Sequence, residues 1–307
     1  MSKKMFEDYE KILVRDEIKK EPTDLEKILD LETEIVRSYG KDDTFQKYDY
    51  DEIYSCIYNL VEEKAKEIKI TPSLLQEYID ARENPEQNNI AIIRGMYSAA
   101  LLEIICTTQP DTQTSIDGKG KTFNYLFFHI RNVKNLTLQN ISGDNILRDA
   151  GSNGSCEHII IKNVTGHETL RNAGWEGNAT NIIISNLKGH NTLRYAGRNN
   201  KESLKYVSLS EIRGDHTLGE AGNDNGSVEH VTAHKIEGYY TFHGLGENGG
   251  RAKHILQEND FTAKQKKILS RIESIVETIH TLSLEKQKKA HDEIAKLQEE
   301  IFAEEEK

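Results

Sequence analysis

Ile159-Ile-Ile-Lys-Asn-Val-Thr-Gly-His-Glu-Thr-Leu-Arg-Asn-Ala-Gly174 is followed 23 residues later by Ile182-Ile-Ile-Ser-Asn-Leu-Lys-Gly-His-Asn-Thr-Leu-Arg-Tyr-Ala-Gly197. The two segments share an alternating apolar stretch, a glycine and the pattern Thr-Leu-Arg-x-Ala-Gly. The glycines recur in two series, at Gly143, Gly166, Gly189, Gly214 and Gly238, and at Gly151, Gly174, Gly197, Gly222 and Gly246. Both series step by 23, 23, 25 and 24 residues. A period of this size indicates stacked structural units.

The content of each unit indicates which kind of stack the chain forms. Helical repeats need about 33 residues or more, and leucine-rich repeats need a helical stretch that is missing here. Short β-branched segments separated by glycines instead predict a parallel β-solenoid over residues 115–255, with 23–25 residues per coil. We expect two or three short strands in each coil, with Ile159 and Ile161 pointing inward and Ile160 pointing outward.

Both flanks of this region have helical spacing. Residues 1–107 predict a small helical domain: Thr71-Pro72 is typical of a helix start, and the stretch from Ala91 to Ile105 should form a buried helix. Residues 261–305 predict a helical hairpin or coiled coil, from apolar residues three and four apart at Leu269, Ile272, Val276, Ile279, Ile294, Leu297 and Ile301. Because an open solenoid end exposes strand edges and core, we interpret both flanks mainly as caps.

Composition narrows the class of protein. The chain has a net charge of −11, but residues 115–255 contain 16 Lys and Arg against 14 Asp and Glu, so the excess acid lies in the flanks. There is no run of about 18 apolar residues and no apolar run after the first lysines, which predicts no membrane span and a cytoplasmic location. Cys56, Cys106 and Cys156 are far apart, so we interpret them as small hydrophobic residues.

The opening of the repeat region resembles a known superfamily. Ser115-Ile-Asp-Gly-Lys-Gly-Lys-Thr-Phe123 and Ile130-Arg-Asn-Val-Lys-Asn-Leu-Thr-Leu-Gln-Asn-Ile-Ser-Gly143 resemble the first coils of right-handed parallel β-helix proteins of the pectate-lyase-like superfamily. The resemblance implies the fold; the superfamily includes polysaccharide lyases, glycoside hydrolases and phage tailspikes. Its catalytic motifs do not carry over: only Arg251-Ala-Lys253 matches the Arg-x-Lys of polygalacturonase-like members.

Repeated polar positions supply the candidate site residues. Arg148, Arg171 and Arg194 occupy one repeat position, so they should form a row at steps of about 4.8 Å, either as a ligand stripe with Trp175 and Tyr195 or as a solvated row neutralised by acids. His167 and His190 share another position, next to acids, and could hold a zinc-like ion, although polar residues at coil corners are normally solvated turn formers.

These patterns favour a non-enzymatic binding or scaffolding module, with no cofactor. Its partner would be a protein, or a second copy bound through the C-terminal helices, with a polysaccharide or other polyanion as a further ligand class. The alternative is a carbohydrate-active enzyme or carbohydrate-binding protein that works along one face of the β-helix.

Overall fold

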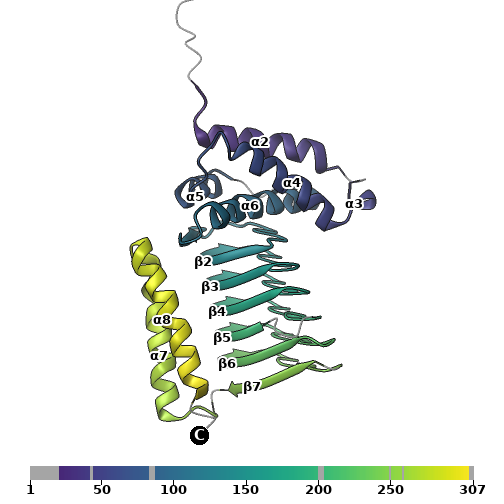
Figure 1. Ribbon diagram of the computed structural model, residues 1–307. Helices are drawn as coiled ribbons and strands as arrows, with labels where there is room; N and C mark the ends of the chain where they lie inside the picture. Colours follow the sequence, from purple (N-terminus) through teal and green to yellow (C-terminus); the bar gives the residue numbers. More distant parts are fainter. Residues whose placement is uncertain are drawn as a thin grey trace, which may run out of the picture.

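The computed structural model describes residues 21–41, 44–82, 87–199, 204–248, 250–257 and 259–303. An N-terminal group of helices lies at one end of a stack of parallel strands, and a C-terminal helical pair runs along the side of the stack (Figure 1). The elements are α2 (Asp24–Tyr39), α3 (Thr44–Lys47), α4 (Tyr50–Lys64), α5 (Pro72–Ala81), α6 (Asn88–Thr108), β1 (Thr114–Asp117), β2 (Asn132–Ser142), β3 (Ser155–Thr165), β4 (Asn178–Lys188), β5 (Leu204–Arg213), β6 (Ser227–Glu237), β7 (Arg251–Gln257), α7 (Ala263–Thr278), the 3-10 helix η1 (Ile279–Thr281) and α8 (Leu284–Ala303).

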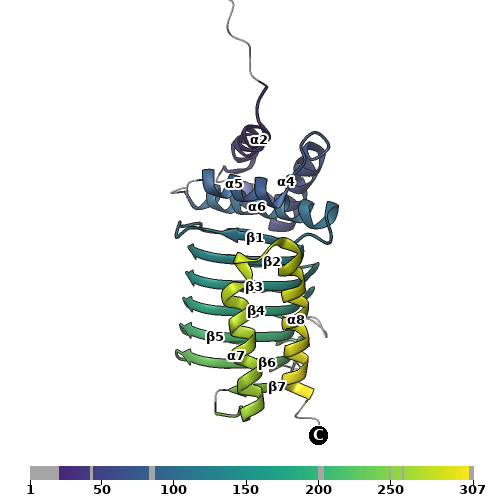
Figure 2. The same cartoon turned by 90° about the vertical axis from the view of Figure 1, so that its left-hand side faces the viewer.

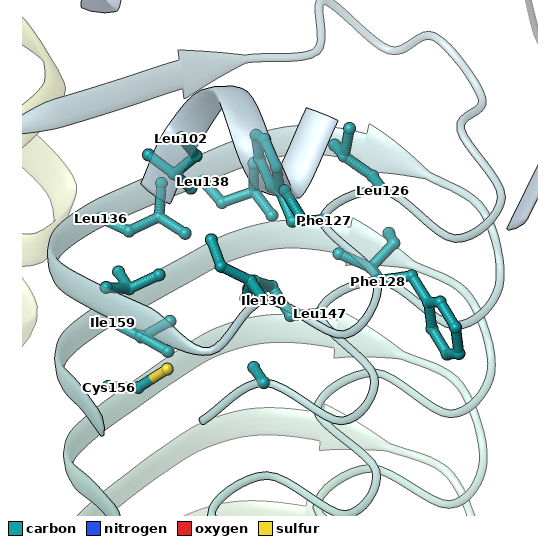
Figure 3. Packing of buried hydrophobic residues seen from close by; sticks show 14 of the residues in the cluster. Leu102, Leu126, Phe127, Phe128, Ile130, Leu136, Leu138, Leu147, Cys156 and Ile159 are labelled. Carbon is teal, nitrogen blue, oxygen red and sulfur yellow. The ribbon is translucent and has the colours of Figure 1, made fainter. Parts of the chain in front are cut away.

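The N-terminal helices cover the first coil of the solenoid. Thr71 caps α5 by accepting the Leu74 N–H, and Pro72 occupies its first turn, as the sequence predicts. The apolar helix α6 is long enough to cross a membrane, but 83% of its apolar window is buried inside the protein. Leu102 of α6 lies over Leu136 and Leu138 of the first coils (Figure 3), so the helices and the solenoid share one hydrophobic core.

Buried polar groups fix this junction. The carboxylate of Glu103 accepts hydrogen bonds from Tyr54 Oη (2.6 Å), Asn132 Nδ2 (2.7 Å) and the Arg131 N–H (3.2 Å). The ring of His129 is buried, with Nε2 3.1 Å from Asp51 Oδ1. Burial lowers the pKa of His129, but the neighbouring carboxylates Asp149 and Asp51 raise it by more, so the net shift is upward. The contact of His129 with Asp51 therefore ties α4 to the first coils.

The strands form one parallel sheet in chain order, β1 to β7. The glycine period sets the register: Ile159 pairs with Ile182 and Ile161 with Ile184, one coil apart. Ile159 and Ile161 lie in the core shared with the N-terminal helices, whereas Ile160 belongs to a second apolar cluster outside the sheet. The predicted alternation of inward and outward residues is confirmed.

Each coil closes through a non-strand segment, here called the return leg, which runs from the turn glycine to the next strand. In the leg after Gly166, every second residue is left-handed, with φ of 59° at Glu168, 55° at Leu170 and 60° at Asn172. The Glu168 N–H bonds forward to the next coil and the Leu170 N–H back to the preceding one, which offsets a cost of about 1–2 kcal/mol for each left-handed residue. The expectation of two or three strands per coil is wrong for the described coils, which have one strand and one return leg.

The turn glycines are required by close stacking. A Cβ on Gly189 would lie 1.8 Å from the carbonyl oxygen of Gly166, and a Cβ on Gly166 equally close to that of Gly143. A side chain at this column would push successive coils apart. This steric limit explains why one glycine series continues through the coils.

The C-terminal hairpin lies on the outer face of the sheet and does not cap the last coil (Figures 1 and 2). Ile272 and Val276 of α7 and Ile294 of α8 pack with the outward residues Ile160 and Ile183. The capping interpretation of this flank is therefore wrong, because the outer face of the sheet is itself apolar and must be covered.

The same docking changes the environment of Lys162. This outward residue is only 6% exposed, and its ammonium lies 2.5 Å from Glu277 Oε2 of α7. Pairing of the C-terminal helices with another chain stays a prediction.

Candidate functional site

The arginine row lies on the outward side of the return legs, here called the return face, opposite the face covered by the hairpin. Within the Thr-Leu-Arg-x-Ala pattern, Leu170 and Ala173 are buried, while Arg171 between them is partly exposed. The arginine side chains have similar exposed fractions, 26% for Arg148, 27% for Arg171 and 25% for Arg194. The backbone of the return leg thus turns one guanidinium per coil outward.

Carboxylates from neighbouring positions pair with the row. Arg148 Nη1 lies 2.9 Å from Glu168 Oε2, and Arg171 Nη1 contacts the other oxygen of the same carboxylate. Arg194 Nη2 lies 2.9 Å from Glu220 Oε1. Glu168 therefore bridges two coils, which replaces the repulsion between stacked guanidiniums by attraction.

Aromatic rings complete the face. The Tyr195 ring lies 4.6 Å from the guanidinium carbon of Arg194 and 5.4 Å from that of Arg171. Arg198 stands between this ring and that of Trp175, at 5.5 and 5.3 Å, and pairs with Asp224. The five residues predicted as a ligand stripe therefore share one face of the rod. Whether they bind a ligand stays a prediction.

The predicted metal pair belongs to a different column, at the corner after the turn glycine. Each side chain of this column accepts the backbone N–H of its equivalent one coil on. The bonds run from His167 N to Asp144 Oδ1 (2.8 Å), His190 N to His167 Nδ1 (3.1 Å), Asp215 N to His190 Nδ1 (3.0 Å) and Tyr239 N to Asp215 Oδ1 (2.8 Å). We call this column the corner ladder.

The corner ladder explains the residue types at its position. Asp and His both place an acceptor atom two bonds beyond Cβ, at the reach that the next backbone N–H requires. The rings of His167 and His190 stack with centroids 5.0 Å apart. Since Nδ1 accepts in both rings, the neutral form carries its proton on Nε2, and neither ring keeps a lone pair for a metal.

Nothing else supports a metal site: the residue ranges described above contain no group of three or more His, Cys, Asp and Glu side chains that could hold an ion. The carboxylates of the return face are held by arginines and not directed at one another. The isolated Arg-x-Lys match lies on β7 in the last coil, and the side chain of Lys253 is outside the described residues.

Several members of the return face were not anticipated from the sequence. Glu220 and Asp224 were not assigned to it, nor was Arg198. Arg198 stands one coil beyond Trp175, 23 residues later, so the repeat spacing alone could have placed the two side by side. In the coil after Tyr195, the same repeat position is occupied by Glu220. That coil also lacks the repeat arginine.

No family model, curated protein or solved structure matches the chain.

Proposed function

We propose that the chain is a binding or scaffolding module without catalytic activity, and that it engages a protein partner through the return face. The observation that carries the proposal is the set of guanidinium and aromatic groups on successive coils, each held by a neighbour. Arg, Tyr and Trp are the residues most enriched at binding hot spots. Side chains fixed before binding lose less conformational entropy on association.

A protein partner is favoured over a polyanion by the charge balance. A polyanion gains affinity from unpaired cations that release counterions. Arg171 shares Glu168 with Arg148, Arg194 pairs with Glu220, and Arg198 pairs with Asp224. A protein surface that offers both charges and apolar contact fits a paired, partly aromatic face better.

Carbohydrate binding or turnover along this face is the second candidate, and the presence of Trp175 and Tyr195 on one surface favours it. Both rings, however, lie beside guanidiniums on the same face. A sugar would compete with Arg198 and Arg194 for them. We therefore place this candidate second.

A relation to the pectate-lyase-like superfamily is a further proposal about the fold. It is supported by the sequence of the opening coils and by the parallel stacking of a long repeat. An experimental structure that established a left-handed coil would contradict it.

The proposal is tested by affinity purification with the tagged full chain from its native host, in parallel with an Arg171→Ala/Tyr195→Ala variant. The matched control is Lys188→Ala/Arg213→Ala. It also removes two large side chains, but at exposed positions at the C-terminal ends of β4 and β5. We expect a protein captured by the wild type and the control to be lost with the return-face variant, and the loss to be reproduced by calorimetry with the purified partner. Equal capture by both variants would contradict the proposal, and binding of an oligosaccharide or polyanion panel instead would assign the face to that ligand.

A further inference from the structure

In the last coil of the solenoid, several backbone N–H groups lie where the preceding coil bonds to its neighbour, but no further coil follows among the described residues. In the next-to-last coil, backbone N–H groups bond forward to the last one: Gly214 to Glu237 O (2.8 Å), His216 to Tyr239 O (2.9 Å) and Glu220 to His243 O (2.8 Å). The equivalent donors of the last coil are at Gly238, Tyr240 and Gly244. Among the described residues, no coil follows to accept from them.

The strand of the last coil has a free edge as well. The Arg251 N–H donates to Gly226 O (3.0 Å), so Arg251 faces β6. The next residue, Ala252, therefore points its N–H and C=O away from β6. The register passes from Val228–Ala252 to His230–His254 without a pair at Lys253, so the alternation shifts there and the next outward N–H and C=O belong to Ile255. Those of Gln257 bond to Asp260 of the same chain. The sheet ends at β7 within the described ranges.

Apolar surface accompanies these groups. Tyr239 and Tyr240 are 78% and 61% exposed, the highest values among the large hydrophobic residues that the structure describes as exposed. Phe242, Leu245 and Ile255 pack against the core but are only partly buried. The end of the rod therefore combines a strand edge with an incompletely covered core, a combination that favours strand addition.

The hairpin restricts what can dock there. The first turn of α7 extends past β7 along the rod (Figures 1 and 2). A second copy that approached with the same end would bring its own α7 against this projection. A single extended segment, in contrast, can lie under β7 beside α7.

We propose that the β7 edge binds an extended segment of a partner protein, which adds as the next strand of the sheet. The segment continues the β-ladder, so its main chain pairs with Ala252 and Ile255. Apolar residues at alternate positions would continue the inward column to which Ile255 belongs. This surface is separate from the return face and does not depend on the function proposed for it.

The probe is a fluorescently labelled peptide with the sequence of β4, Asn178–Lys188, which already pairs on both edges within the sheet. We expect saturable binding to the full chain by fluorescence anisotropy. Ala252→Pro removes one outward N–H and leaves the Arg251 bond to β6 intact, so it should weaken binding about tenfold. Ala252→Val is the matched control, and a peptide with proline at the position of Ile183 should not bind.

Hydrogen exchange on the unmodified protein keeps the test decisive if Ala252→Pro does not fold. The amides of Ala252 and Ile255 should become protected when the peptide is added. No binding, or binding without this protection, would overturn the proposal. A dimer by light scattering that Ala252→Pro converts to a monomer would also overturn it, because the occupant would then be a second copy.

Discussion

The two long faces of the rod stack their coils with different kinds of outward residue. On the strand side, outward Ile160 and Ile183 form an apolar surface that the hairpin buries. On the return side, outward Arg171 and Glu168 are only partly exposed but stay at the surface, and their charges are satisfied between coils. Outward apolar residues in a solenoid repeat thus indicate a face that another element covers, whereas outward charged ladders indicate a face left to solvent or ligand.

The largest expected effect tests whether the covered face behaves as core. Ile160→Ala and the inward Ile161→Ala should each reduce the free energy of unfolding by about 2–5 kcal/mol, because both side chains are buried. Arg171→Ala should cost about 1 kcal/mol or less, since its ion pair is partly exposed. Chemical denaturation measures all three. If Ile160→Ala cost no more than Arg171→Ala, the hairpin would not cover the strand face.

Acid should loosen the hairpin from the strand face. His291 of α8 faces Thr137 and the His158 ring, with Asp292 and Glu157 nearby. Burial, and secondarily His158, lowers the pKa of His291 to about 3. The unfolded chain therefore binds more protons between that value and the ordinary value of about 6.5, so stability is present above this window and is lost as the pH falls. We expect a loss of about 2 kcal/mol near pH 5.

Thermal melts between about pH 7 and 4 measure this effect. His291→Gln keeps a polar side chain of similar length and should flatten the pH dependence. A wild-type melting temperature that does not change over the range would contradict the buried, neutral state of this ring.

The smallest effect concerns the corner ladder. His167→Ala removes one acceptor from the exposed N–H of His190 and should cost about 0.5–1.5 kcal/mol. His167→Asp should restore most of this, because Asp144 makes the same bond in the preceding coil. Denaturation of the two variants tests the comparison, and equal losses would mean that the acceptor does not matter.

Much of the fold could be predicted from the repeat. The spacing of the glycines gave the length of each coil and so located the coils. The two-residue period of a strand assigned the inward and outward faces at Ile159 to Ile161. The return leg could not be anticipated, since left-handed Leu170 is a conformation that propensity disfavours and only cross-coil hydrogen bonds stabilise.

The candidate site was predictable to the same extent as the repeat. Arg148, Arg171 and Arg194 share one face because they share one repeat position. Their partners Glu168 and Glu220 occupy different columns, and which acid reaches which guanidinium depends on side-chain rotamers. The position of the hairpin was mistaken because the apolar spacing of a helix identifies what must be buried but not the surface that buries it.

The unequal lengths of the coils show where such a rod can accept extra residues. The paired glycines of a coil are always eight residues apart, and the strand residues that precede them keep a constant interval. The variation falls at one corner, where the intervals are Gly151 to Cys156 (five), Gly174 to Ala179 (five), Gly197 to Leu204 (seven) and Gly222 to Val228 (six), although the second members are register partners in adjacent strands. That corner is where this architecture accepts insertions, and it is the natural place to graft a foreign loop without shifting any strand against its neighbour.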